Sequence, residues 1–327
     1  MATKHSEPRP SAEAPAALST APAAAIPFWR DLQFRLEYAL LRFVVGVFRS
    51  LPLSLACNFS ARAWRALAPI INPKRHQRAL ANLTLAYPEA TDAWRSDIAL
   101  RHWENLGRVM VETICLDRIL ATPGAVEIVS SGTFARYRSK LGPVIGVSLH
   151  QGNYELAIWP LTMAGQSPAA VYRSVNNPYI DAYLRHQRRD LYPGGLFGRG
   201  KVEGDHGDDQ RTGRILMDYV RRGGKLGLVC DLYDRNGMPI PFFGHDARTV
   251  MIAPLIARRV GARIWMARCL RIGSQSRFKI ELKELRIPRT ANQSDDIKVA
   301  LVAMNAQFEA WVREAPEQWM WSNRRWS

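Results

Sequence analysis

Residues 144–160, VIGVSLHQGNYELAIWP, decide the fold of this chain. The first six residues, 144–149, are apolar or small and predict a buried strand. His150 follows, then a short polar turn at 151–153, and then an apolar run that carries Glu155. A strand that ends in a histidine and turns into a helix places that histidine at the carboxyl edge of a sheet. Open α/β folds bind their ligands at this edge.

The spacing between His150 and Glu155 is H-x-x-x-x-E. On one straight helix these residues would lie about 140° apart and would not meet. They can meet if His150 lies in the loop and Glu155 in the first helical turn, with Asn153 as the N-cap. A carboxylate that accepts the Nδ1–H of a histidine fixes the tautomer and strengthens Nε2 as a base. The alternative is a histidine at a strand end and an unrelated surface glutamate.

Candidate strands and helices alternate through the rest of the chain. Apolar runs predict strands at 125–129, 144–149, 169–172, 225–230, 263–270 and 278–282. Amphipathic runs predict helices at 154–164, 178–189, 213–222, 253–260 and 297–313, after a helical region at 61–119 that is broken at Pro73 and Pro88. Pro160 is expected to kink or shorten its helix. The alternation predicts an α/β fold, a mainly parallel mixed sheet flanked by helices.

The N-terminal part of the chain changes character at residue 28. Residues 1–27 are rich in Ala, Pro, Ser and Thr and are predicted to form a disordered tail. Residues 28–60 are strongly apolar, but Arg35, Arg42 and Arg49 recur every seven residues and so lie near one helix face. We expect a membrane-associating helix that lies in the interface with its arginines at the headgroups. A single-pass span and an amphipathic helix packed on the main domain are the alternatives.

The charge of the chain is strongly basic. There are 45 Lys and Arg residues against 29 Asp and Glu, which gives a formal net charge of +16. This excess favours an anionic partner, which could be a nucleic acid, an anionic membrane surface or an acidic protein. The four cysteines are widely spaced in apolar surroundings, so we expect buried reduced thiols and neither a zinc site nor disulfides. A catalytic Cys230 at a strand end is the lesser alternative.

Further motifs follow in a fixed order after the first. Residues 171–178 read VYRSVNNP, residues 228–231 end a strand in Asp231, residues 241–244 read PFFG, and residues 316–326 read PEQWMWSNRRW. With H-x-G-N-x-E at 150–155, this set resembles the lipid A biosynthesis late (lauroyl/myristoyl) acyltransferase family, within the glycerolipid acyltransferase-like superfamily. The resemblance runs from about residue 34 to residue 326. The chain departs from many relatives after Asp231, and this leaves the role of Asp234 open.

The resemblance implies an O-acyltransferase. The donor would be acyl carrier protein, and the acceptor a hydroxyl of a lipid A precursor, a phosphorylated glycolipid. The enzyme would work at the cytoplasmic face of the inner membrane, peripheral or single-pass, against an anionic membrane surface. Residues 61–327 would form the acyltransferase domain. We expect no cofactor, no metal and no nucleic acid partner, since the sequence carries no phosphate loop, dinucleotide motif or metal-ligand set.

The same resemblance suggests roles for particular residues. His150 would be the general base and Glu155 its orienting acid. Gly152 and Asn153 would let the acyl carbonyl approach backbone N–H groups. Asp231 would hold Arg173 or a sugar hydroxyl, and Arg173 would meet a phosphate, unless it forms a structural ion pair with Asp181 or Asp231.

A basic cluster is expected to bind the acidic carrier protein or the lipid phosphates. Its members are Arg185, Arg188, Arg189, Arg199, Lys201, Arg211 and Arg214. Two other functions stay open at this point. The chain could acylate another lysolipid, or it could be a non-catalytic protein that binds membranes or nucleic acid.

Overall fold

The computed structural model describes residues 26–130, 142–199 and 208–326. The predicted tail at 1–27 therefore lies almost wholly outside the described residues. The chain begins with five helices: α1 Phe28–Ser50, α2 Leu53–Ile71, α3 Pro73–Ala86, α4 Asp92–Ile114 and α5 Leu116–Ala121. The breaks predicted at Pro73 and Pro88 are confirmed, because α3 begins at Pro73 and ends just before Tyr87.

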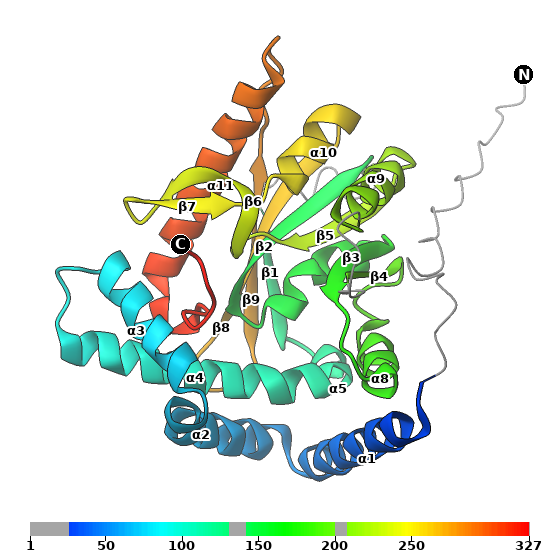
Figure 1. Cartoon of the computed structure of the whole chain (residues 1–327), viewed down its shortest axis with the longest axis vertical. Coiled ribbons are helices and arrows are strands. Elements are labelled where there is room, and N and C mark those ends of the chain that lie inside the picture. Colours follow the sequence, from blue (N-terminus) through cyan, green and yellow to red (C-terminus); the bar gives the residue numbers. More distant parts are fainter. Residues whose placement is uncertain (1–25, 131–141, 200–207, 327) are drawn as a thin grey trace, which may run out of the picture.

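Within the described ranges, seven strands form one sheet in the order β1-β9-β8-β2-β5-β3-β4. Their bounds are β1 Val126–Ser130, β2 Val144–Gly152, β3 Pro168–Arg173, β4 Gly195–Arg199, β5 Lys225–Val229, β8 Arg263–Arg271 and β9 Phe278–Leu285. Neighbouring strands are parallel except for the antiparallel pair β8–β9. The predicted α/β fold with a mainly parallel mixed sheet is confirmed, and every strand predicted from the sequence is present (Figure 1).

Helices connect the strands and cover the sheet. They are η1 Tyr154–Ile158, α7 Trp159–Met163, α8 Pro178–Arg188, α9 Asp208–Arg221, α10 Ile252–Val260, α11 Gln293–Glu314 and η2 Pro316–Gln318. Pro160 has the predicted effect, because the chain forms only a 3-10 turn and one short α-helix there. An antiparallel hairpin of β6 Tyr233–Phe242 and β7 His245–Thr249 lies beside α11. We did not predict this hairpin or β4.

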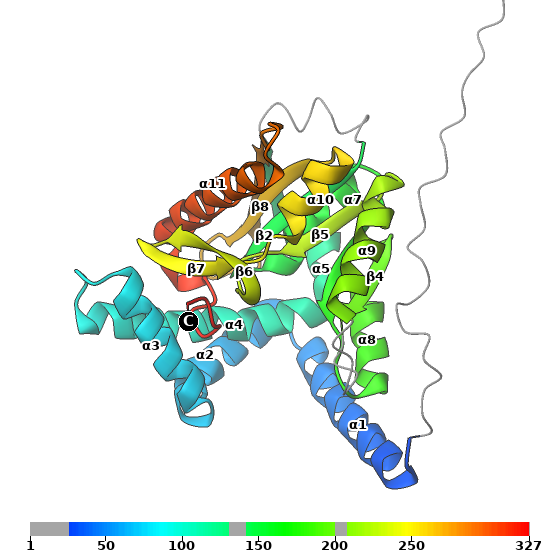
Figure 2. The ribbon, with the colours of Figure 1, turned by 45° about the horizontal axis from the view of Figure 1, so that its top comes forward.

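The core fills the space between the sheet and its helices. Central strands contribute fully buried side chains such as Ile145, Leu226 and Ile264, and α11 contributes Leu301 and Phe308 to the same core cluster. Helix α4 packs along α2 and also contacts the C-terminal turn η2 (Figure 2). The C-terminal segment is thereby held between α4 and the carboxyl edge of the sheet.

Helix α1 lies outside the sheet layers and contacts α8 (Figure 2). Its three arginines share one side, as predicted, but they contact residues of α8 and α5, which does not fit the expected placement at the headgroups. The Arg35 guanidinium lies 5.2 Å from the Tyr179 ring centre, that of Arg42 lies 5.1 Å from the Tyr183 ring centre, and Arg49 pairs with Asp117 at 2.7 Å. Among the helices of the described ranges, none combines the length and apolar character that crossing a bilayer requires.

Candidate active site

His150 and Asp231 meet at the carboxyl edge of the sheet. His150 lies near the end of β2, and Asp231 follows β5, the parallel neighbour of β2. The His150 Nδ1 lies 2.7 Å from one Asp231 carboxylate oxygen, and the His150 backbone N–H donates to the other at 2.8 Å. The carboxylate thus holds both the ring and the main chain of the histidine. Since Asp231 accepts from Nδ1, Nε2 is the nitrogen left to accept a proton.

Asp231 is almost fully buried, with 1% of its surface exposed. Burial opposes its ionisation, but the nearby His150 and the hydrogen bonds from His150 and Trp319 outweigh burial and lower the pKa of the carboxyl below its usual value. The His150 side chain is 15% exposed and packs edge-on against Tyr154 at 4.7 Å between ring centres. No described residue is hydrogen-bonded to its Nε2. In the His150–Asp231 pair, the carboxylate is therefore buried and the Nε2 side of the histidine is accessible.

Glu155 does not contact His150 in the way predicted from the sequence. It lies in the 3-10 turn η1 and forms a bidentate ion pair with Arg188 of α8, at 2.6 and 2.9 Å. The expected hydrogen bond from His150 Nδ1 to Glu155 is therefore wrong, because Asp231 of the neighbouring strand already occupies that position. Burial lowers the pKa of the Arg188 guanidinium, but the charge of Glu155 outweighs this and the net pKa is raised.

The turn after His150 is built on close backbone contact. Gly152 has φ +57°, and a Cβ added there would lie 1.8 Å from the backbone oxygen of Cys269 in β8. Only glycine fits such a position. Asn153 stands at the N-cap position of η1, but its side chain does not cap it as predicted. Instead its Nδ2 donates to Glu112 of α4 at 3.1 Å.

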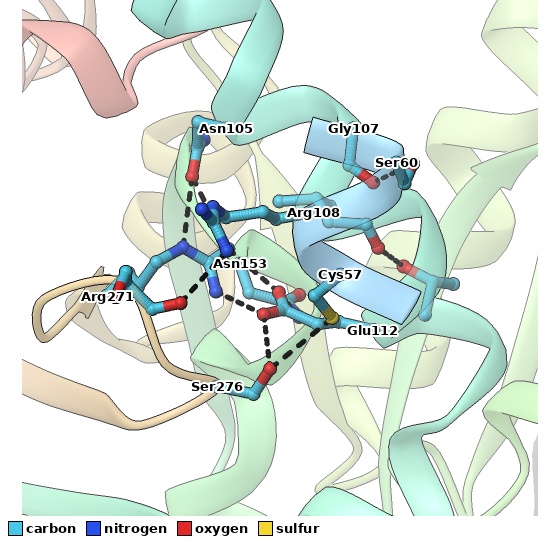
Figure 3. Close-up of polar contacts among 12 residues, drawn as sticks. Cys57, Ser60, Asn105, Gly107, Arg108, Glu112, Asn153, Arg271 and Ser276 are labelled. Atoms are coloured by element: carbon cyan, nitrogen blue, oxygen red, sulfur yellow. Dashed lines mark hydrogen bonds and ion pairs between the residues drawn. The ribbon is translucent and has the colours of Figure 1, made fainter. Parts of the chain in front are cut away.

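Glu112 is the centre of a buried polar network beneath this turn (Figure 3). Both of its carboxylate oxygens pair with the Arg271 guanidinium, and Ser276 Oγ donates to it at 2.8 Å. Glu112 is fully buried, and the Arg271 side chain is 4% exposed. A buried charge pair is tolerated when its remaining lone pairs are satisfied, which is the case here. The network thus connects α4, β8 and the turn that follows His150.

The basic cluster is only partly an exposed face. Arg188 is committed to Glu155, and Arg185 bonds Asp181 at 2.9 Å. Arg189 is 63% exposed, and Arg214 is exposed as well. Lys201 lies outside the described residues, and so do the side chains of Arg199 and Arg211.

Arg173 ends β3 at the same edge of the sheet and is exposed. Among the described residues it forms no ion pair with Asp181 or Asp231, so neither of the structural pairings considered for it is found. Asp231 likewise holds His150 and not Arg173.

The four cysteines are free and buried, as predicted. Burial raises the pKa of the Cys230 thiol well above its usual value, and it raises that of Cys57 to about 11. A protonated buried thiol is a poor nucleophile, so Cys230 does not fit the catalytic alternative. Within the described ranges, no group of three His, Cys, Asp or Glu side chains is arranged to hold a metal ion.

Comparison with known proteins agrees with the motifs. Residues 31–327 match the family model described as bacterial lipid A biosynthesis acyltransferase. The chain belongs to this family. It is similar to the lipid A biosynthesis palmitoleoyltransferase of Escherichia coli K12, with 23% identity over 299 residues, 88% of this chain and 91% of the relative.

The lipid A biosynthesis acyltransferase of Shigella flexneri matches with the same identity and coverage. The E. coli K12 lipid A biosynthesis lauroyltransferase is 24% identical over 257 residues, 75% of this chain and 76% of the relative. The chain is therefore an acyltransferase of lipid A biosynthesis.

One residue of this acyltransferase's site was not found from the sequence. Trp319, in the segment that follows α11, donates its indole N–H to Asp231 at 2.7 Å. The two residues are 88 positions apart, and no local pattern signals such a contact. The available signal was the dense aromatic motif at 316–326, which contributed to the family resemblance but gave Trp319 no role of its own.

Proposed function

We propose that this acyltransferase moves a fatty acyl chain from acyl carrier protein to a hydroxyl of a lipid A precursor, with His150 as the general base. The observation that carries the proposal is the 2.7 Å contact between His150 Nδ1 and Asp231 beside an accessible Nε2. Asp231 takes the orienting role that the sequence pattern suggested for Glu155. General-base assistance of this kind contributes about 10²–10⁴-fold in rate.

The chemistry is one acyl transfer. Nε2 takes the proton of the acceptor hydroxyl while that oxygen attacks the thioester carbonyl carbon and forms a tetrahedral intermediate. The C–S bond then breaks, and the imidazolium returns the proton to the leaving thiolate. Asp231 stabilises the imidazolium between these steps.

The pair Glu155–Arg188 supports this reaction from the neighbouring helix. Glu155 engages Nε and one Nη of Arg188, which leaves other guanidinium N–H groups for an anionic substrate group. A phosphate of the carrier's phosphopantetheine or of the glycolipid has suitable chemistry. We infer that Glu155 acts through Arg188, and that Arg173 offers a second guanidinium at the same edge of the sheet. Backbone N–H groups near Gly152 and Asn153 are candidates for holding the oxyanion.

The N-terminal helices are proposed to hold the enzyme at the cytoplasmic face of the inner membrane. The side of α1 away from its arginines exposes Leu36, Leu40, Phe43 and Val47. Helix α2 exposes Phe59, Ile70 and Ile71. Contiguous exposed apolar surface of this kind marks a membrane or protein contact. We assign residues 28–60 to membrane association, 1–27 to a tail and 61–327 to catalysis. Deleting residues 1–50 should move the protein to the soluble fraction after cell lysis if α1 is the main anchor, and full retention on membranes would place the anchor in α2 or farther along the chain.

Acyl carrier protein is the proposed donor, recruited by the exposed basic face near the end of α8. Arg189→Glu tests this, because Arg189 is exposed, whereas Arg188 is largely buried in its pair with Glu155 and is assigned to a substrate phosphate. The variant should raise the apparent KM for acyl carrier protein and weaken its salt dependence, with a smaller change for acyl-coenzyme A. An equal loss with both donors would assign the face to the lipid phosphates.

The decisive experiment assays His150→Ala with an acyl-carrier-protein donor and a lipid A precursor. Near-wild-type turnover would eliminate the general-base role. Mass spectrometry of lipid A from cells with and without the gene should show one secondary acyl chain fewer in its absence. Unchanged lipid A together with altered phospholipids would favour another lysolipid acceptor.

A further inference from the structure

The C-terminal segment closes over the back of the His150–Asp231 pair. Gln151 and Trp319 form an antiparallel β-bridge, and the Met320 N–H donates to the His150 carbonyl at 3.0 Å. These contacts bring the Trp319 indole N–H to 2.7 Å from Asp231 Oδ2, the same oxygen that accepts the His150 backbone N–H. The carboxylate thus accepts three hydrogen bonds, and only the one from His150 Nδ1 belongs to the proton-transfer pair.

The position of the Trp319 ring is fixed by other aromatic rings. Its centre lies 4.6 Å from that of Trp321, 5.7 Å from that of Phe242 and 6.3 Å from that of Trp326. The residue is 2% exposed. A rigid ring with a single N–H donor can hold a carboxylate in one orientation.

Several titratable groups of the described residues lie around Asp231. His150 contacts it, and Cys230, Tyr154 and Arg325 interact with it through charge. Cys230 and Tyr154 stay neutral, since burial raises the pKa of each. Arg325 is 1% exposed and is held by polar oxygens, with no carboxylate contact among the described residues. Trp319 therefore gives Asp231 a hydrogen-bond donor that does not titrate.

We propose that Trp319 is a positioning residue for the acyl transfer: its indole N–H holds the Asp231 carboxylate in the orientation that accepts His150 Nδ1–H. This assignment rests on the proposed function of His150 as the base. Without the Trp319 donor, Oδ2 retains only the hydrogen bond from the His150 backbone N–H, and the orientation of the buried carboxylate is fixed less tightly.

Losing the N–H should have two effects. The rate constant kcat should fall roughly 10- to 100-fold, the range expected for a hydrogen bond to a charged group, with little change in KM. The charge of Asp231 would also be less compensated, so the His150–Asp231 pair would bind a proton more tightly. The acid limb of the pH–kcat/KM profile should then move to higher pH.

Trp319→Phe and Trp321→Phe form a matched pair of variants. Each removes one buried indole N–H from the same segment, but the Trp321 donor bonds the Pro316 carbonyl at 2.7 Å and not Asp231. Trp319→His restores a ring N–H at a similar distance from Cβ and should recover much of the rate at neutral pH. Thermal melts of all three in the same detergent measure the contribution of packing.

The proposal is supported if Trp319→Phe lowers kcat and shifts the acid limb, Trp321→Phe does neither, and Trp319→His recovers activity. It is overturned if the two Phe variants lose activity equally, or if the acid limb stays in place. His150→Ala is assayed in parallel. If that variant stays active, the proposed function has failed, whereas an inactive His150→Ala beside a wild-type-like Trp319→Phe rejects the Trp319 role alone.

Discussion

Replacing Glu112 by glutamine should lower the free energy of unfolding more than removing one charge of an exposed ion pair. The substitution keeps the shape of the side chain but leaves the Arg271 guanidinium buried without its counter-charge. Breaking a buried ion pair from one side costs about 3–5 kcal/mol. At about 2 °C per kcal/mol for a chain of this size, the melting temperature should fall by roughly 6–10 °C.

Differential scanning fluorimetry in a fixed detergent measures this shift, and a double-mutant cycle isolates the pair. Arg271→Met alone should also be costly, whereas the double variant should lose at least about 1 kcal/mol less than the sum of the two. Asp218→Asn is the control, since its pair with Arg221 is more than half exposed and should cost at most about 1 kcal/mol. A Glu112→Gln melt within about 2 °C of wild type, or a strictly additive double variant, would refute the reasoning.

Three further predictions concern the site and its surroundings. Asp231→Asn should lower kcat by about 10²–10⁴-fold and leave the fold intact by circular dichroism, because it removes the charge that stabilises the His150 imidazolium. Gly152→Ala should fold poorly, since the new Cβ would lie 1.8 Å from the Cys269 backbone oxygen, and the yield of monodisperse protein checks this. Burial lowers the pKa of His102 to about 3. Below about pH 6.5 His102 is therefore protonated in the unfolded chain but stays neutral in the folded chain. Stability should therefore fall as pH drops from about 6.5 to about 3, and His102→Gln should flatten the slope in urea titrations at several pH values.

The layers of the fold could be predicted because buried parallel strands and their connecting helices leave simple patterns. Strand β2 ends close to where its apolar run ends, and Pro160 shortens the following helix. Strand β6 was missed because Gly237, Pro239 and Pro241 lie inside it, and such residues argue against a strand from the sequence alone. The hairpin with β7 tolerates them because it is a separate two-stranded unit.

The position of a candidate residue could be predicted where it depends on one strand, whereas a contact that depends on two strands could not. The position of His150 at a strand end follows from local sequence. Its partner does not, because Glu155 is near in sequence while Asp231 is near only after β2 and β5 pair. The contact between Trp319 and Asp231 was harder still to predict from the sequence, since it depends on where the segment after α11 meets the sheet.

The hydrogen bond from Trp319 to Asp231 has a consequence during synthesis on the ribosome. The donor is made 88 residues after the carboxylate, which at 5–20 residues per second is a delay of about 4 to 18 s. During that interval the nascent chain already contains β2, β5 and the helices proposed to reach the bilayer, but its histidine–aspartate pair has not received its last hydrogen bond. The proposed membrane contact of α1 and α2 can thus form before the proposed catalytic pair has its full set of hydrogen bonds.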